Sequence, residues 1–147
     1  MAANIERFNV LTGAIFAKLY EEFPEPTNLS AMNFAEQLKI GGSDFVSVRF
    51  FTSTVEWLAD HGYLKKGTTV GEGLVTNCVL TARTLELLSA LPSSLESESK
   101  SEQPSLGDQL ITATKDGVTE KITELTREFL SEAVIFTTRV ATGLMSN

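Results

Sequence analysis

Apolar residues recur every three or four positions in several stretches of this chain, a spacing that predicts helices with one buried face. We expect a first helix that Asn4 caps and Pro24 ends, a short second helix after Ser30, and a long third helix that stops at Gly62. The apolar stripe of the first helix consists of Ile5, Phe8, Leu11, Ile15 and Leu19. The broader apolar face of the third helix consists of Val48, Phe50, Phe51, Val55, Trp57 and Leu58.

A β-hairpin and another helix follow the third helix. Residues 63–66 and 74–80 are typical of two short strands around a glycine-rich turn. Thr81 is a suitable cap for the next helix, which Pro92 ends. The sequence therefore predicts a fold that is mainly α with a small β-hairpin.

A segment of different composition separates this part of the chain from the rest. Residues 93–104 are mostly Ser and Glu and contain almost no apolar side chain. Such a segment cannot bury enough surface to offset the entropy of ordering it. We interpret it as a flexible acidic, Ser-rich linker between a domain over residues 1–92 and an element over residues 105–147. A regulatory or partner-binding segment is the alternative.

Residues 105–147 predict an amphipathic C-terminal helix. Ser105 is a suitable cap, and the apolar stripe pauses at Gly117 and then resumes. Glu120 begins a row of four glutamates on the other side, and like charges four residues apart weaken an isolated helix. Burial of the apolar face must therefore supply most of the stability. The candidate interface residues on this face are Ile122, Leu125, Phe129, Ala133, Phe136 and Val140.

Three surfaces are candidates to cover that face: the rest of the chain, the same helix of a second subunit, and a membrane. We rank them in that order. The mixed steps of three and four resemble a short coiled-coil seam, which keeps a homodimer among the candidates. Anionic lipid would repel the row of glutamates, and no run of about 18 apolar residues exists, so we expect no membrane contact.

The order of helices and hairpin resembles a winged helix-turn-helix domain. The resemblance covers residues 4–92 and rests on that order and on residues 57–64, Trp-Leu-Ala-Asp-His-Gly-Tyr-Leu, where a recognition helix ends at a glycine turn before the first wing strand. It implies a winged-helix core to which the C-terminal amphipathic helix is appended. It also implies one of two functions, DNA binding through the third helix and the wing, or protein interaction.

The charge of the chain argues against nucleic acid as a partner. The chain has 12 Lys and Arg against 19 Asp and Glu, for a formal net charge of −7. Neither part is basic, since the net charge is −3 over residues 1–92 and −4 over residues 93–147. A specific DNA complex usually needs several phosphate contacts. The basic residues that are candidates for such contacts are Lys39, Arg49, Lys65 and Lys66.

Catalytic chemistry finds little support in the sequence. His61, the single histidine, stands where it can bond the last carbonyls of the third helix. Cys78, the single cysteine, alternates with other side chains in a strand and is typical of a packing residue. These two residues match no metal-binding motif. We therefore expect no enzyme activity, no metal and no cofactor.

The length of 147 residues fits one small domain with an appended element. A single cysteine cannot form an internal disulfide, and we expect a cytoplasmic protein. Our leading hypothesis is a non-enzymatic winged-helix protein that acts as a protein-interaction or regulatory accessory module, with an acidic surface suited to a basic or nucleic-acid-binding partner. The alternative is a DNA-binding transcriptional regulator that dimerises through its C-terminal helix.

Overall fold

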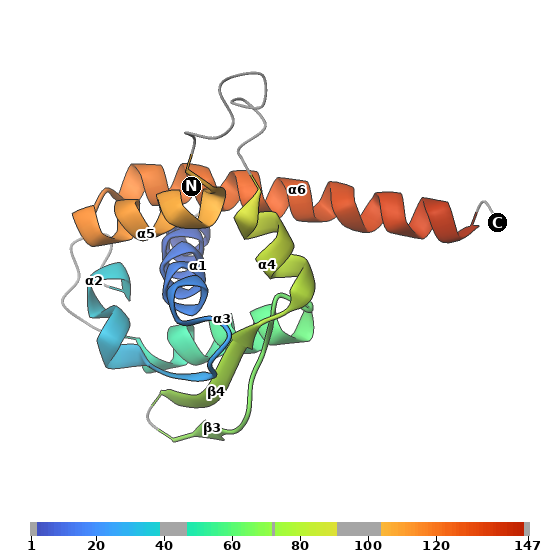
Figure 1. Cartoon of the computed structure of the whole chain (residues 1–147). Coiled ribbons are helices and arrows are strands. Elements are labelled where there is room, and N and C mark those ends of the chain that lie inside the picture. Colours follow the sequence, from blue (N-terminus) through green and yellow to red (C-terminus); the bar gives the residue numbers. More distant parts are fainter. Residues whose placement is uncertain (1–2, 39–46, 72, 91–103, 146–147) are drawn as a thin grey trace.

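Helices make up most of this chain (Figure 1). The computed structural model describes residues 3–38, 47–71, 73–90 and 104–145, and from residue 134 on it describes the backbone alone. The elements in chain order are α1 (Ala3–Glu22), β1 (Thr27–Ser30), the 3-10 helix η1 (Ala31–Phe34), α2 (Ala35–Leu38), α3 (Val48–Asp60), β2 (Leu64–Lys65), β3 (Thr69–Val70), β4 (Leu74–Leu80), α4 (Ala82–Ser89), α5 (Leu106–Asp116) and α6 (Thr119–Met145). The prediction of a mainly α fold with a small β-hairpin is confirmed.

The antiparallel sheet is built around β4. Strands β2 and β3 pair with one edge of β4 and form the predicted hairpin, while β1 pairs with the other edge. The sequence analysis missed β1, because Leu29 is the only apolar side chain in the strand and gives no alternating pattern. Leu29 lies opposite Val75, and both side chains are fully buried. Tertiary burial therefore stabilises this strand.

Helix α1 is the centre of the molecule. Every residue from Asn9 to Ala17 is buried. The cause is visible in Figure 1, where α5 and α6 cover one side of α1 and the sheet and α3 cover the other. Gly13 and Gly107 allow close approach here, since a Cβ on either would lie within 2.7 Å of atoms of the neighbouring helix. The C-terminal helices thus share one core with the rest of the chain.

Three aromatic rings join the two parts of that core. Phe129 of α6 lies 4.7 Å from Phe16 of α1 and 5.8 Å from Tyr63, measured between ring centroids. All three side chains are buried. The rings therefore tie α6 to α1 and to the start of the hairpin.

Four of the six candidate interface residues on α6 face the chain's own core. Ile122, Leu125, Phe129 and Ala133 are buried in the core cluster, so the rest of the chain covers this part of the helix. They offer no free surface to a second subunit. The side chains of Phe136 and Val140 lie outside the described part of the structure.

The C-terminal element is two helices and not one, which corrects the prediction of a single helix over residues 105–147. Ser105 caps α5 as predicted, since its hydroxyl accepts a hydrogen bond from the Asp108 amide at 3.1 Å. Gly117 ends α5 in the left-handed conformation with φ of 70°, and α6 begins at Thr119. The predicted pause in the apolar stripe is therefore a helix break, which folds α5 back beside α6.

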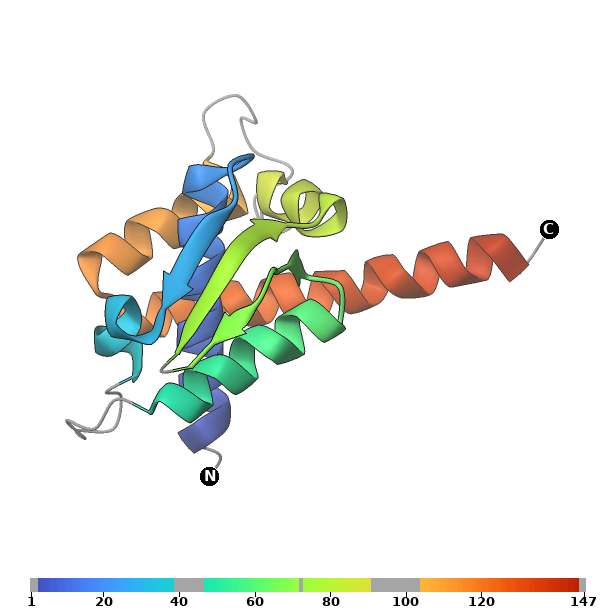
Figure 2. The ribbon, with the colours of Figure 1, turned by 90° about the horizontal axis from the view of Figure 1, so that it is seen from below.

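The last part of α6 leaves the body of the molecule. The helix continues to Met145, and its backbone extends beyond all other described elements in both Figure 1 and Figure 2. We call residues 134–145 the α6 tail. None of the helices in the described part of the chain combines the length and the hydropathy needed to cross a membrane.

Candidate interaction surface

Helix α3, the predicted recognition helix, is fixed at both ends by local hydrogen bonds. Ser47 caps it, because the Ser47 hydroxyl accepts a hydrogen bond from the Phe50 amide at 3.0 Å. Gly62, with φ of 79°, turns the chain into β2. The inner face of α3 carries Phe51 and Val55 into the core. The other face of α3 is consequently directed outward.

That outward face forms an apolar groove with the beginning of α1. The groove has a volume of about 350 Å³. Ile5 is 52% exposed and Trp57 is 40% exposed, although both are large apolar side chains. We call this groove the α1–α3 groove; it is lined by Asn4, Ile5, Phe8, Phe50, Ser53, Thr54 and Trp57.

Trp57 forms a wall of the groove and is held on three sides. Its ring meets Phe8 edge-on at 5.3 Å and stacks on Tyr63 at 5.9 Å and on His61 at 4.0 Å. His61 Nδ1 donates a hydrogen bond to the Trp57 carbonyl at 2.9 Å, which confirms the predicted role of His61 at the end of this helix. The groove wall is therefore formed before any partner binds.

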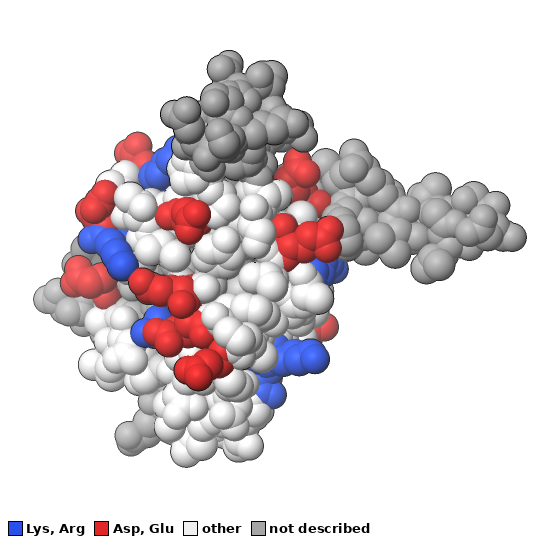
Figure 3. Space-filling view, in the orientation of Figure 1, with Lys and Arg blue, Asp and Glu red and all other residues white. Residues whose placement is uncertain are grey.

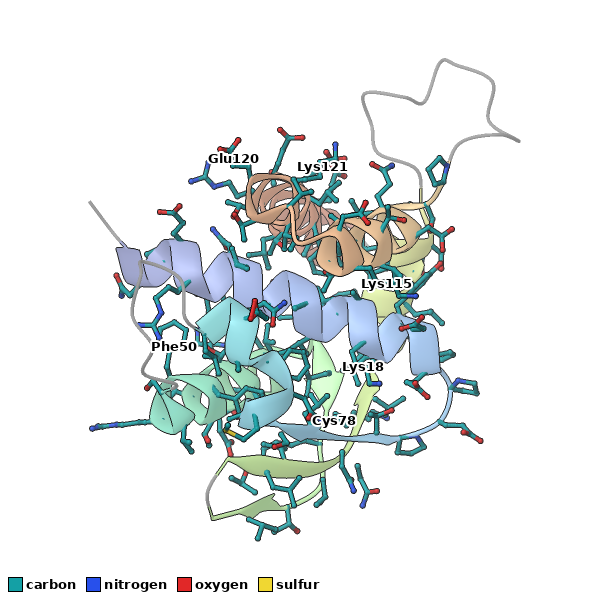
Figure 4. All side chains as sticks on the ribbon, turned by 90° about the vertical axis from the view of Figure 1, so that its left-hand side faces the viewer. Lys18, Phe50, Cys78, Lys115, Glu120 and Lys121 are labelled. Atoms are coloured by element: carbon teal, nitrogen blue, oxygen red, sulfur yellow. The ribbon has the colours of Figure 1, made fainter. Side chains whose placement is uncertain are left out.

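Arg7 of α1 lies against Phe50, the other aromatic residue that α3 contributes to the groove. Its guanidinium lies 4.4 Å from the centre of the Phe50 ring and donates a hydrogen bond to the Leu38 carbonyl at 3.2 Å. Figure 4 shows Phe50 at the end of the molecule where α1 begins. Asp60, which is exposed, lies one turn after Trp57 on the same side of α3, whereas Glu6 lines a different hollow beside α6. A positive charge, Arg7, and a negative charge, Asp60, therefore lie near the apolar groove.

Lys66, a predicted phosphate contact, is engaged within the chain. Its ammonium lies 3.3 Å from the Glu56 carboxylate, which also accepts a hydrogen bond from the Thr69 hydroxyl at 2.8 Å. The hydrogen bond from Thr69, together with Lys66, lowers the pKa of Glu56 below its usual value against the opposing effect of burial. The charge of Lys66 is therefore balanced by a carboxylate on α3.

The other predicted phosphate contacts do not gather in one place. Arg49 is exposed in the first turn of α3, and Lys65 is exposed in β2, which begins after the last turn. The helix from Arg49 to Asp60 is about 16 Å long at 1.5 Å per residue. Lys39 lies outside the described residues. The described basic candidates thus provide no continuous positive surface.

Among the charged side chains on the face shown in Figure 3, acidic ones are more numerous than basic ones. Two lysines near the end of α1 are paired, since Lys115 lies 3.0 Å from Glu21 and Lys18 lies 3.5 Å from Glu22. A polar hollow of about 380 Å³ lies beside Lys18, Glu21 and Lys115. Figure 4 places both lysines away from Phe50, toward the other end of α1. This face is therefore separate from the α1–α3 groove.

The residues considered for chemistry have structural surroundings. Cys78 is fully buried, and burial raises the pKa of its thiol to about 11. The thiol is thus protonated at neutral pH and packs as an apolar group. Among the described residues, no three or more His, Cys, Asp or Glu side chains are arranged to hold a metal ion.

Comparison of this chain with protein-family models, with curated proteins and with solved structures finds no match. We therefore infer the function from the chemistry of the surface.

The sequence analysis predicted no groove. It placed Ile5 and Trp57 on buried helix faces, and both are exposed, whereas Phe8 and Phe50 pack against the core as predicted. Ile5 and Phe8 were predicted on the buried stripe of the first helix, yet Ile5 is more than half exposed. One feature of the sequence could have predicted the α3 side of the groove. The third helix has more apolar residues than one buried stripe needs, and Phe50 and Trp57 lie beside that stripe.

Proposed function

We propose that this chain is a winged-helix protein that acts by binding other proteins. The order of elements from α1 to β4 supports the winged-helix interpretation, because α3 is followed directly by the hairpin and β1 joins the sheet beside β4. In such a domain α3 corresponds to the recognition helix and the β2–β4 hairpin to the wing. The exposed side of α3 is then the surface whose chemistry decides the partner.

The apolar groove on that side of α3 is the observation that supports a protein partner. A surface that contacts phosphate needs several cations, whereas this surface exposes Trp57 and Ile5. A rigid apolar groove fits the apolar face of an amphipathic helix, whose aromatic or aliphatic residues recur every three or four positions. Such a function requires no catalytic group.

A selection experiment tests this function. A displayed library of amphipathic helices is selected against the full chain, and the selected helices are then measured on two variants. Ile5→Asp places a charge in the groove and should weaken binding at least about tenfold, because apolar contacts at an interface centre dominate affinity. Val118→Asp changes an equally exposed apolar residue outside the groove and should leave binding unchanged.

The emission of Trp57 provides a second readout, since it is the single tryptophan of the chain and lies in the groove. Selected helices should shift its emission to shorter wavelength as they exclude water. Selected helices that bind both variants equally and leave this emission unchanged would show that the groove is not the binding surface.

DNA binding is the second candidate function, and the exposed positions of Arg49 and Lys65 favour it. In that case α3 and the wing would contact phosphates through these two residues, and Lys66 would have to leave Glu56 to join them. The net charge of −7 weighs against this candidate.

A further inference from the structure

We propose that the α1–α3 groove receives the α6 tail of a second copy of this chain, so that two copies exchange tails reciprocally. This inference rests on the proposed function, because it names a partner for the same groove. Each copy carries both the α6 tail and the α1–α3 groove, and a two-fold exchange would cover both in each copy.

The sequence of the tail is suited to burial. Seven of its twelve residues are apolar, and Arg139 is its single charged residue. The tail continues a helix whose earlier turns are packed in the core, but its own apolar residues add to stability only where a partner covers them. The backbone of the tail nevertheless extends away from all other described elements (Figure 2). A partner outside this chain could therefore reach the tail and cover its apolar residues.

The dimensions of the tail and the groove are compatible. The tail is about 18 Å long at 1.5 Å per residue, and the groove side of α3 from Phe50 to Trp57 spans about 10 Å. Phe136, Val140 and Leu144 are four residues apart, which is the anchor spacing of a helix that binds in a groove. One tail is therefore long enough to cover one groove.

The charges of the chain favour the α6 tail, over the other surfaces of a second copy, as the segment that binds in the groove. Two molecules with net charge −7 repel each other, and an acidic segment would add repulsion at the exposed Asp60, one turn after Trp57. The tail has no carboxylate side chain, and the positive charge of Arg139 is compatible with a nearby Asp60. Self-association through the tail thus avoids the acidic faces of both copies.

Mass measurements on full-length variants test the exchange. The wild-type chain should have twice the 16.0 kDa mass of one chain. Ile5→Asp in the groove and Phe136→Asp in the tail should each weaken self-association at least about tenfold. Val118→Asp, a matched change of an exposed apolar residue elsewhere, should leave the dimer intact.

Mixing the two variants gives the decisive readout. The Ile5→Asp chain keeps an intact tail and the Phe136→Asp chain keeps an intact groove, so an equimolar mixture should restore a 1:1 dimer with one tail bound. Pairing of tail against tail predicts no restoration, and that result would overturn the exchange. A dimer that persists in both variants would overturn it as well.

A monomeric wild-type chain would also overturn the exchange. In that case, selected helices that still require Ile5 would leave the proposed function intact. A monomeric chain whose groove binds no selected helix would contradict both proposals.

Discussion

Gly13 sets the separation of α1 and α6. A Cβ at this position would lie 2.5 Å from Thr126 Oγ1 and 2.6 Å from Ile122 Cγ2, so one of the two helices would have to move. Gly107 has the same role toward the Tyr20 ring, at 2.7 Å. Both contacts join α1 to the C-terminal helices, and the position of the α6 tail depends on them.

Gly13→Ala should therefore lower the free energy of unfolding by about 1–3 kcal/mol, the usual cost of overpacking a core. Gly71→Ala is the control, since a Cβ there meets no atom within 4 Å and the expected change is within about 0.5 kcal/mol. Denaturant unfolding of the three proteins measures both values. Equal stability of the Gly13→Ala and wild-type chains would mean that α1 and α6 do not pack this closely.

Two of the four helix caps predicted from the sequence are confirmed. The predictions for Asn4 and Ser30 are wrong, since Asn4 lies inside α1 and the Ser30 side chain makes no capping hydrogen bond. Thr81 and Ser105 cap α4 and α5 as expected, because a cap bonds an amide only three residues away. The solvent exposure of apolar side chains could not be predicted from such local signals. Ile5 and Leu11 are both apolar positions of the same predicted stripe, yet one is exposed and the other buried, because only tertiary packing decides which part of α1 is covered.

Among the elements, α3 and the hairpin are joined through Glu56. Its carboxylate accepts a hydrogen bond from Thr69 of β3 and pairs with Lys66. Since the folded chain lowers the pKa of Glu56, this contact stabilises the fold fully above the usual carboxyl pKa. The stabilisation is lost as the pH falls through the lowered pKa.

Glu56→Gln should accordingly destabilise the chain at pH 7 by at most about 1 kcal/mol, because the pair is partly exposed to solvent. The difference between wild type and variant should shrink at a pH below the lowered pKa, where Glu56 is protonated in the wild type. Urea unfolding of both proteins across this pH range measures the difference. A difference that does not depend on pH would show that ionisation of Glu56 has no part in holding the hairpin.

Elements that carry their own apolar pattern or turn residues were predictable, and β1, which has neither, was not. Helices α1, α3 and α4 and the hairpin occur where the apolar pattern predicted them. Strand β1 has four residues and forms because it pairs with one edge of β4. This pairing joins positions that are far apart in the sequence. The groove was unpredictable for the same reason, since Phe8 and Trp57 meet only after α1 and α3 have packed.

In the whole molecule, charge and apolar surface are separated. Acidic side chains outnumber basic ones on the face shown in Figure 3, while the α1–α3 groove exposes the large apolar side chains of Ile5 and Trp57. The α6 tail adds a second apolar sequence at the far end of the last helix. This distribution favours association with protein over association with nucleic acid.

A titration of the full chain with mixed genomic duplex fragments, at low and at near-physiological salt, separates the two functions. We predict no saturable binding at the higher salt, because exposed Arg49 and Lys65 are too few to neutralise the phosphates of a specific site. Saturable binding that survives the higher salt, and that Arg49→Ala or Lys65→Ala weakens, would contradict the protein-binding function and identify α3 and the wing as a DNA-binding surface.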